Sequence, residues 1–433
     1  MNDNDRSIVG LVMLAHGMVH TYELTVPIFL PIWLAEFTAV DLGVTQIAVT
    51  TATLGAVVTV GYGLFGLGAL PGGILVDRLG SRRLITVCLV GMALSFVVLG
   101  VAPSVVAIAL ALVVWGVSAS VYHPAGLALI SKGVEERGSG FAYHGIAGNL
   151  GIGLGPLAAT LLLLVVDWRT VALLLAAPAL LAALYAARAD FDETAAVETA
   201  AADGGDSKAD AGVDSLGEFL AESKQLFAGS FALVFVVVMC SGLYYRGVLT
   251  FLPQLLEGLP GFAPIPASEV VPQAVLDLGS GAVTGQRINP ERYFYSGLLT
   301  VGVVGQYVGG KLTDRLPVEY GIAGGFGGLA VLAVLFLPVA SLGVGPLIAL
   351  GAVLGAFLFV VQPMYQAAVA EYTPAGTRGL SYGFTYLGVF GVGALGATVA
   401  GAVLTYASPP ALFAVLAGFA VVATGLGVYL GTR

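Results

Sequence analysis

The sequence predicts an all-α integral membrane protein with twelve transmembrane helices, arranged as two pseudo-symmetric six-helix bundles. Composition, the number of long apolar runs and an internal repeat support this prediction. Of the 433 residues, 58% are hydrophobic and 10% are charged, whereas soluble globular proteins are about 45–50% apolar and about 25% charged. A water-soluble fold could not bury so many apolar side chains and still present a polar surface. Lipid is therefore expected to be the solvent for most of the chain.

Twelve apolar runs reach the length of about 20 residues that a helix needs to cross a bilayer. They lie at 8–36, 44–76, 83–102, 105–131, 140–165, 170–188, 228–255, 292–313, 320–341, 345–370, 379–405 and 410–431. The first run is too long for a signal peptide and lacks a small-residue cleavage site. We therefore expect it to stay in the protein as the first helix.

The basic residues predict the orientation of these helices. Lys and Arg collect in the cytoplasmic loops of membrane proteins. With the N-terminus in the cytoplasm, thirteen basic residues lie inside and three lie outside, at Arg169, Arg287 and Arg292. Both termini are therefore expected in the cytoplasm of a multi-pass plasma-membrane protein.

The runs divide the chain into an N-terminal bundle, 1–188, a cytoplasmic linker, 189–226, and a C-terminal bundle, 227–433. The linker is rich in Ala, Asp, Glu, Gly and Ser, a composition that cannot bury a core, and is expected to be flexible. At its end, Ser215 and Glu218 have the spacing of a capping box, which predicts an amphipathic helix on the membrane surface. The Pro-rich segment 257–291 is expected to be a long outer loop, either a tolerated insertion or a lid.

The two halves repeat one another. Gly72-Gly73-Ile74-Leu75-Val76-Asp77-Arg78-Leu79 recurs as Gly309-Gly310-Lys311-Leu312-Thr313-Asp314-Arg315-Leu316, with six of eight positions identical. Phe29-Leu30-Pro31 likewise recurs as Phe251-Leu252-Pro253, in the same chain order. Parallel repeats of six helices are the plan of many secondary transporters, in which the substrate lies between the repeats near the middle of the membrane.

The segment from Gly72 to Arg83, Gly-Gly-x-Leu-x-Asp-Arg-x-Gly-x-Arg-Arg, resembles the loop between helices two and three of the major facilitator superfamily. The second copy departs from that signature at Pro317 and lacks the trailing Arg pair. The resemblance implies a conformational latch, in which Asp77 meets a helix N-terminus and an arginine of the other half when the outside is open. The residues expected in the latch are Gly73, Asp77, Arg78, Arg82, Arg83, Asp314 and Arg315.

A narrower resemblance is to the fosmidomycin-resistance-like drug exporters. It is carried by His123-Pro124, by the Gly-rich run from Gly148 to Pro156, and by Tyr245-Arg246 before Phe251-Leu252-Pro253. It implies export of a small organic compound in exchange for protons. Helix four lacks the buried Arg that many proton antiporters carry, which leaves the antiport open.

Every histidine of the sequence falls in a predicted helix of the first half. His16, His20 and Glu23 share one face of the first helix because of their spacing, and His123 and His144 follow in helices four and five. Ionisable groups inside a bilayer are costly and usually face the bundle interior, where they serve function. Because histidine takes and releases a proton near neutral pH, these residues predict a proton route. Satisfied packing histidines are the alternative.

Arg246 is the one arginine inside a predicted helix, and its place in the repeat puts it opposite Glu23. It is expected either to pair with Glu23 or to bind an anionic substrate, since guanidinium matches carboxylate and phosphonate. Tyr245, Gln362 and Tyr365 are further candidates for contact with substrate.

These residues predict a secondary active transporter, not an enzyme, with a small-molecule substrate, protons and the lipid bilayer as partners. No phosphate-binding Gly-Lys-Ser/Thr loop is present, and we expect no cofactor, no resident metal, no nucleic-acid partner and a monomeric state. Proton-coupled uptake of an organic anion through Arg246 stays open. Divalent metal transport through His16, His20, Glu23 and His123 also stays open, as does a sensor that does not transport.

Overall fold

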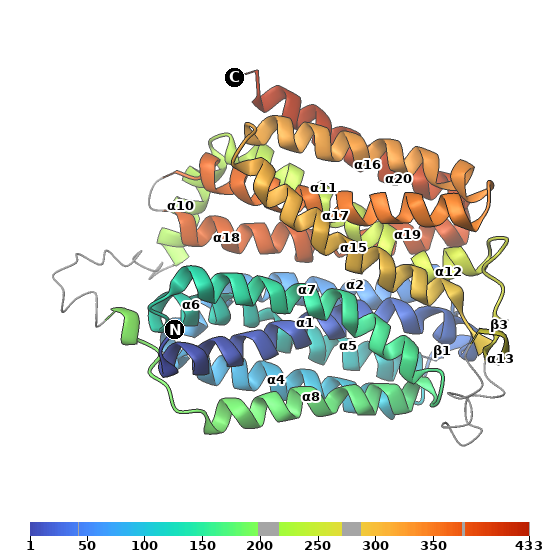
Figure 1. The fold of residues 1–433 in the computed structure, drawn as a ribbon, viewed down its shortest axis with the longest axis horizontal. Coiled ribbons are helices and arrows are strands. Elements are labelled where there is room, and N and C mark those ends of the chain that lie inside the picture. Colours follow the sequence, from blue (N-terminus) through green and yellow to red (C-terminus); the bar gives the residue numbers. More distant parts are fainter. Residues whose placement is uncertain (42, 198–215, 271–286, 375–376, 433) are drawn as a thin grey trace.

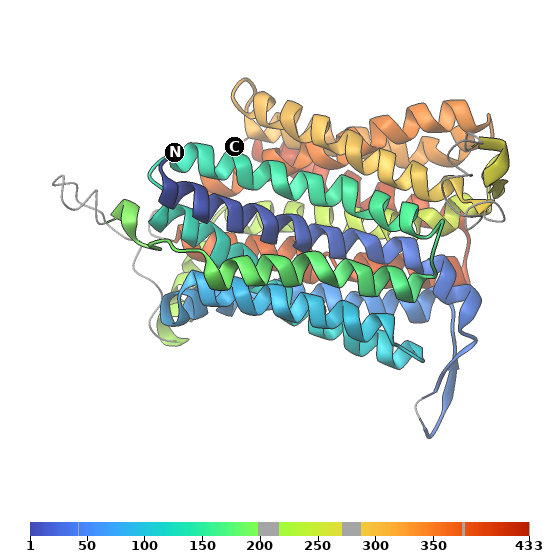
Figure 2. The ribbon, with the colours of Figure 1, turned by 60° about the horizontal axis from the view of Figure 1, so that its bottom comes forward.

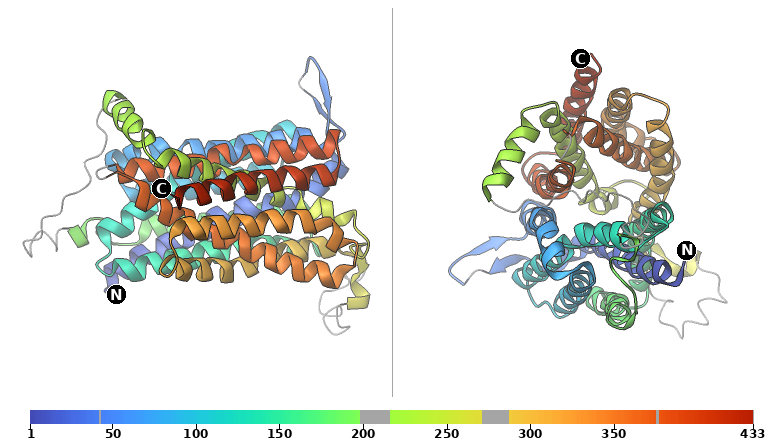
Figure 3. Two further views of the ribbon diagram at one scale, coloured as in Figure 1. Left: turned by 90° about the horizontal axis from the view of Figure 1, so that it is seen from above. Right: turned by 90° about the vertical axis from the view of Figure 1, so that its left-hand side faces the viewer.

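The computed structural model describes residues 1–41, 43–197, 216–270, 287–374 and 377–432. Long helices run side by side, and the first and second halves of the chain form two bundles that face each other (Figures 1 and 3). Both ends of the chain lie at the same end of the bundles, which we call the termini end. The strands β1 (Ala39–Asp41) and β2 (Gln46–Ala48) mark the opposite end, which we call the hairpin end.

The first bundle follows the chain from the N-terminus. Its helices are α1 (Asp3–Glu36), α2 (Thr51–Leu67), α3 (Ala69–Leu79), α4 (Ser81–Gly100), α5 (Val105–Ser120), α6 (Tyr122–Gly133), α7 (Arg137–Leu162) and α8 (Trp168–Arg188). Polar side chains begin several of them: Asn2 accepts a hydrogen bond from an amide of α1, Ser104 does so for α5, and Asp167 for α8. Such caps satisfy amides that have no partner within the helix.

The second bundle repeats this arrangement. Its helices are α11 (Phe231–Leu249), α12 (Leu252–Glu257), α15 (Pro290–Thr313), α16 (Val318–Ala340), α17 (Val344–Tyr372), α18 (Arg378–Tyr386), the π-helical turn η1 (Leu387–Val392), α19 (Leu395–Tyr406) and α20 (Pro409–Leu430). Between α12 and α15, the described residues form β3 (Ile265–Pro266), α13 (Ala267–Val270) and β4 (Arg287–Ile288), and β3 pairs with β4.

Twelve membrane-spanning segments account for this architecture. Among the described residues, ten helical segments are long and apolar enough to cross a membrane. The pair α2 and α3, bent by 46° at Gly68, forms another, and α15 completes the set in the position of the eighth predicted span. The prediction of an all-α membrane fold of two six-helix halves is therefore confirmed.

The second span begins later than the sequence predicted. Residues 46–48 belong to the β1–β2 hairpin, which extends beyond the helices (Figure 2), instead of to a helix that starts at residue 44. The helix starts at Thr51 because Thr50 and Thr53 form a capping box, in which each backbone amide bonds to the other's hydroxyl. The apolar run alone did not reveal this boundary.

The segment predicted as a linker is partly ordered. Residues 189–197 pack at the termini end, where the amide of Asp192 donates to Asn4 Oδ1. Residues 198–215 lie outside the described part of the chain, and α10 (Leu216–Phe227) follows. Phe219 and Phe227 of α10 lie against Phe384 of α18, while Leu220 is exposed. One face of α10 therefore covers the second bundle, and its contact with a membrane surface stays a prediction.

The two bundles meet most closely where α2 packs against α19 and η1, and where α7 packs against α15. On α2, the Thr51 and Thr59 hydroxyls donate to the carbonyl oxygens of Gly401 and Ala394, each at 2.9 Å. A Cβ at Gly66 would overlap the backbone of Gly391. Small residues let membrane helices come this close.

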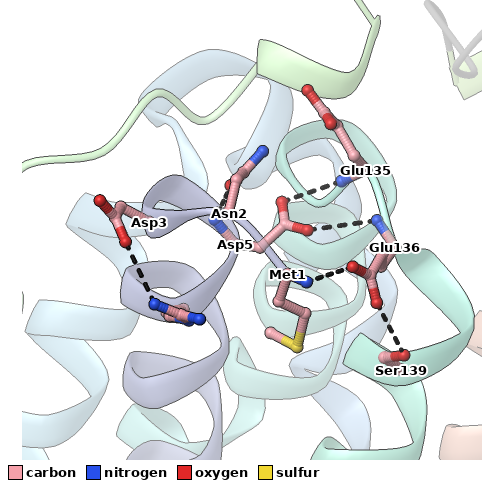
Figure 4. Close-up of polar contacts among 8 residues, drawn as sticks. Met1, Asn2, Asp3, Asp5, Glu135, Glu136 and Ser139 are labelled. Atoms are coloured by element: carbon pink, nitrogen blue, oxygen red, sulfur yellow. Dashed lines mark hydrogen bonds and ion pairs between the residues drawn. The ribbon is translucent and has the colours of Figure 1, made fainter.

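The first helix is tied to the start of α7 at the termini end (Figure 4). The buried Asp5 carboxylate accepts hydrogen bonds from the amides of Glu135, at 3.0 Å, and Glu136, at 3.2 Å. The terminal amine of Met1 donates to the Glu136 carboxylate, which lowers the pKa of Glu136. A carboxylate is favourable at this position because helix N-termini carry partial positive charge.

Gly66→Ala is expected to destabilise the protein by about 1–3 kcal/mol, because the added methyl group has no space between α2 and η1. Gly63→Ala is the control, since a Cβ there meets nothing within 4 Å and alanine favours a helix. The apparent melting temperatures of the purified variants in detergent provide the comparison. Equal melting temperatures for the two variants would contradict the close packing.

Asp5→Ala is expected to lower the stability by about 1–3 kcal/mol, because two part-buried amides lose their acceptor. Asp3→Ala is the matched control, because the Asp3 side chain is fully exposed. Thermal unfolding checks both, together with protease cleavage near residue 5. If Asp3→Ala were as damaging as Asp5→Ala, the buried cap would not be the cause.

Candidate functional site

A cavity of about 580 Å³ lies between the two bundles. All nine residues predicted to contact substrate or protons line it, namely His16, His20, Glu23, His123, His144, Tyr245, Arg246, Gln362 and Tyr365. Its wall continues along Leu127 and Ser131 of α6 and Phe141 of α7 toward the termini end. On the hairpin side of Glu23, the Tyr295 hydroxyl of α15 donates to the Leu24 carbonyl of α1 at 3.3 Å. The cavity therefore extends from the middle of the protein toward the termini end.

Glu23 of α1 and Arg246 of α11 form an ion pair that joins the two bundles. Each residue is only 2% exposed. The Arg246 guanidinium lies over the ring of Tyr62, with its carbon 3.8 Å from the ring centroid. The hydroxyl of Tyr62 in turn donates to the backbone carbonyl of Glu23 at 2.6 Å. A buried charge is tolerated only when it is paired and hydrogen-bonded, and here each charge satisfies that need for the other.

A chain of hydrogen bonds extends from this ion pair along α1. His20 Nδ1 lies 2.5 Å from Glu23 Oε2, and His20 Nε2 lies 3.1 Å from His16 Nε2. His16 Nδ1 donates to the backbone carbonyl of His144 at 2.7 Å. The i, i+4 and i+7 spacing on one helix face produces this line of side chains. The structure thus connects the carboxylate to three of the four histidines.

The Gly-rich run of α7 makes room for the histidines. A Cβ at Gly148 would overlap the ring of His16, and one at Gly151 would overlap the backbone of Gly17. The absence of side chains at these positions lets α7 approach α1, so that the rings of His16 and His144 stack with centroids 3.8 Å apart. The same run carries part of the narrower family resemblance.

The second bundle contributes polar and aromatic groups to the cavity. Tyr365 is buried and Gln362 is half-buried, and both come from α17. Tyr386 stacks on His123 with ring centroids 4.9 Å apart, and Phe390 lies close to both rings. Two buried nitrogens of the cavity, Arg246 Nε and His144 Nε2, have no hydrogen-bond partner among the described residues.

Sequence reasoning did not identify Tyr386 and Phe390 as cavity residues, nor Tyr62 as the ring beneath Arg246. Tyr62 lies in an apolar, Gly-rich run, and Tyr386 and Phe390 lie in another, so no local pattern distinguishes them from packing residues. The pairing of Arg246 with Glu23 could be predicted from the repeat, whereas the ring beneath the guanidinium depends on how α2 is rotated.

The predicted latch residues lie at the termini end, where Asp77 of α3 pairs with Lys132 of α6 at 3.1 Å. This partner belongs to the same bundle, whereas the resemblance implied an arginine of the other half. Gly73, Arg78, Arg83, Asp314 and Arg315 are exposed. In this conformation, the ion pair of Asp77 therefore does not hold the two bundles together.

The carboxylate at the start of α4 belongs to Glu193, not to Asp77. Glu193 Oε2 accepts hydrogen bonds from the amides of Ser81, at 2.8 Å, and Arg82, at 3.2 Å. The Arg82 side chain bonds to the carbonyl oxygens of Ala186 and Ala187 at the end of α8. In this conformation a residue of the segment predicted as a linker therefore holds the start of α4, and the latch of Asp77, expected when the outside is open, stays a prediction.

The family profile of the Major Facilitator Superfamily matches residues 11–302 and 270–433. Among curated proteins, the chain is similar to a puromycin resistance protein from Streptomyces alboniger, with 35% identity over 123 residues. That match takes in 28% of this chain and 24% of the relative.

Solved structures of transporters share the fold at low sequence identity. The nucleoside transporter NupG, as a D323A mutant, aligns over 98% of this chain and 99% of its own, with a TM-score of 0.69 and 14% identity. A D-xylose–proton symporter aligns over 98% of this chain and 97% of its own, with a TM-score of 0.68 and 13% identity. A peptide transporter gives 0.67 and 14%, over 98% of this chain and 93% of its own.

Arg246→Gln is expected to destabilise the protein by about 3–5 kcal/mol, because it leaves the Glu23 charge buried without a partner. The double variant Glu23→Gln/Arg246→Gln removes both charges and is expected to recover much of that loss. Apparent melting temperatures of wild type, both single variants and the double variant complete the cycle. Strictly additive effects would contradict a direct interaction between the two side chains.

Proposed function

This chain belongs to the Major Facilitator Superfamily, and on that premise we propose that it is a monomeric secondary transporter of the plasma membrane that exports a small organic compound in exchange for protons. The observation that carries the proposal is the buried Glu23–Arg246 ion pair, which ties the two bundles together beside the cavity. Alternating access requires the bundles to rock against each other around a central site. A tie between them that depends on charge can link that motion to a proton.

Proton coupling follows from the position of Glu23. Among the described residues, Glu23 is the only carboxylate that lines the cavity. A proton on this carboxylate would remove one charge of the pair and weaken its hold on Arg246. Glu23 lines the cavity and contacts His20. A proton can therefore reach Glu23 from the side to which the cavity opens. Proton binding and bundle movement are thus coupled through a single ion pair.

Export is the direction that we propose, and the orientation that the basic residues predict is compatible with it. With the termini end in the cytoplasm, the cavity of this conformation opens to the cytoplasm, where an exporter takes up its cargo. The resemblance to the fosmidomycin-resistance-like exporters and the partial similarity to a puromycin resistance protein favour the same direction.

The cavity wall favours an organic compound with an acidic group. Within the described part of the chain, Arg246 Nε has no hydrogen-bond partner, and guanidinium binds carboxylate and phosphonate groups well. Tyr245, Gln362 and Tyr365 add hydrogen-bonding groups, and the rings of Tyr386 and Phe390 provide apolar surface. The same free nitrogen supports a second candidate, proton-coupled uptake of an organic anion through Arg246.

Glu23→Gln is expected to abolish proton flux that is driven by cargo, because the amide cannot take up a proton. The test uses proteoliposomes loaded with a fluorescent pH indicator and exposed to fosmidomycin, a phosphonate, or puromycin. Wild-type protein is expected to move protons in exchange for the compound. The variant is expected to move no protons but still to exchange cargo for cargo in a counterflow assay. Glu371→Gln is the matched control, because it makes the same change of carboxylate to amide at the exposed end of α17, outside the cavity wall.

Wild-type proton flux in Glu23→Gln would show that this carboxylate is not the coupling residue. The sign of the flux separates the two candidates, because export exchanges protons for cargo and uptake moves both in the same direction. A growth test of a sensitive bacterial host against the same compounds, with and without the gene, provides an independent readout of export.

A further inference from the structure

We propose that His16, His20 and His123 form a binding site for a divalent transition-metal ion on the wall of the cavity. One ring nitrogen from each of the three histidines lies within 4.8 Å of the others, and all three side chains are buried and line the cavity. The site goes beyond the proposed proton-coupled transport, which requires no metal.

The hydrogen-bond chain determines which nitrogens can bind the ion. A carbonyl oxygen only accepts, so His16 Nδ1 carries the hydrogen in its bond to His144. Glu23 is paired with Arg246 and accepts from His20 Nδ1. In neutral rings, each Nε2 then carries a lone pair, and the two Nε2 atoms lie 3.1 Å apart. Facing lone pairs repel each other, so this arrangement calls for a positive species beside both atoms.

The separation of the two nitrogens suits a metal ion. Zinc binds imidazole nitrogen at about 2.0–2.1 Å, so two nitrogens on one tetrahedral ion lie about 3.3 Å apart by the same geometry. His16 and His20 lie one helical turn apart on α1, so both Nε2 atoms can contact the same ion. His123, near the start of α6, supplies a third imidazole, which lines the same cavity from a different helix.

The outer contacts of the two rings are those of metal-ligating histidines. Such histidines usually donate their second N–H group to a carboxylate or a backbone carbonyl, which orients the ring. His20 has the Glu23 carboxylate in this role, and His16 has the His144 carbonyl. A proton between the Nε2 atoms would also relieve the repulsion, but it would engage only two of the three imidazoles whose nitrogens lie within 4.8 Å of one another. The three imidazoles together therefore favour a metal ion.

The charges around the site indicate what completes its coordination. Glu23 is already neutralised by Arg246, so the three neutral imidazoles leave the charge of a divalent ion uncompensated. The remaining coordination positions face the cavity, because the three ligands line its wall. An anionic donor atom, from water or from a cargo with an acidic group, fits there. Imidazole ligands suit zinc, nickel, copper and cobalt.

The test is a titration of Co²⁺ and Zn²⁺ into purified wild-type protein that carries no histidine tag and has been treated with a chelator. We expect one ion per chain, with Co²⁺ giving visible absorption bands typical of nitrogen ligands and Zn²⁺ displacing it. Loss of a residue that orients a metal ligand typically weakens metal binding by about 10–100-fold, and we expect that effect for Glu23→Gln. A larger loss of affinity is expected when a ligand itself is removed, in His16→Ala, His20→Ala or His123→Ala.

Cys240→Ala is the matched control. Cys240 is a buried thiol that could bind a metal ion, but it does not line the cavity. It is expected to bind Co²⁺ as wild type does. Absence of stoichiometric binding to the wild-type protein would overturn the proposal without relying on any variant. A sulfur-to-cobalt band, or loss of binding in Cys240→Ala, would likewise overturn the assignment of these ligands. Proton-coupled transport in metal-free protein would leave the proposed function intact.

Discussion

The ion pair between Glu23 and Arg246 is the constraint on which the rest of the cavity depends. The two charges come from different bundles and are both 2% exposed, so neither is tolerable without the other. The surrounding contacts keep them together: Tyr62 lies under the guanidinium, and its hydroxyl holds the backbone of Glu23. Movement of one bundle against the other therefore has to break or replace this pair.

The polar groups of the cavity are organised around that pair. From the carboxylate, hydrogen bonds run through His20 to His16 and on to the backbone of α7. The glycines of α7 let its backbone approach closely enough for this contact. Close helix packing elsewhere has the same origin, since Gly66 lets α2 touch η1 of the other bundle. Small residues thus position the few charged ones.

Much of the architecture could be predicted from the sequence, because apolar runs and an internal repeat are visible in it. The nine candidate residues also converge on one cavity, since helical spacing and the repeat determine which faces they occupy. The hairpin at residues 39–48, the position of Tyr62 and the contact of Glu193 with α4 could not be predicted. The hairpin forms by local pairing next to an apolar run that does not mark its boundary. The Glu193 contact joins segments far apart in the chain, and the position of Tyr62 depends on the rotation of a helix that has no polar pattern.

The most direct test of the central claim is a distance measurement between spin labels on the two bundles at the termini end. Labels at Ser131 of α6 and Tyr382 of α18, both on the cavity wall, report its opening once Cys88 and Cys240 are replaced. If the buried ion pair ties the bundles together, the distance distribution in Glu23→Gln differs from that of the parent protein. Identical distributions would contradict the account.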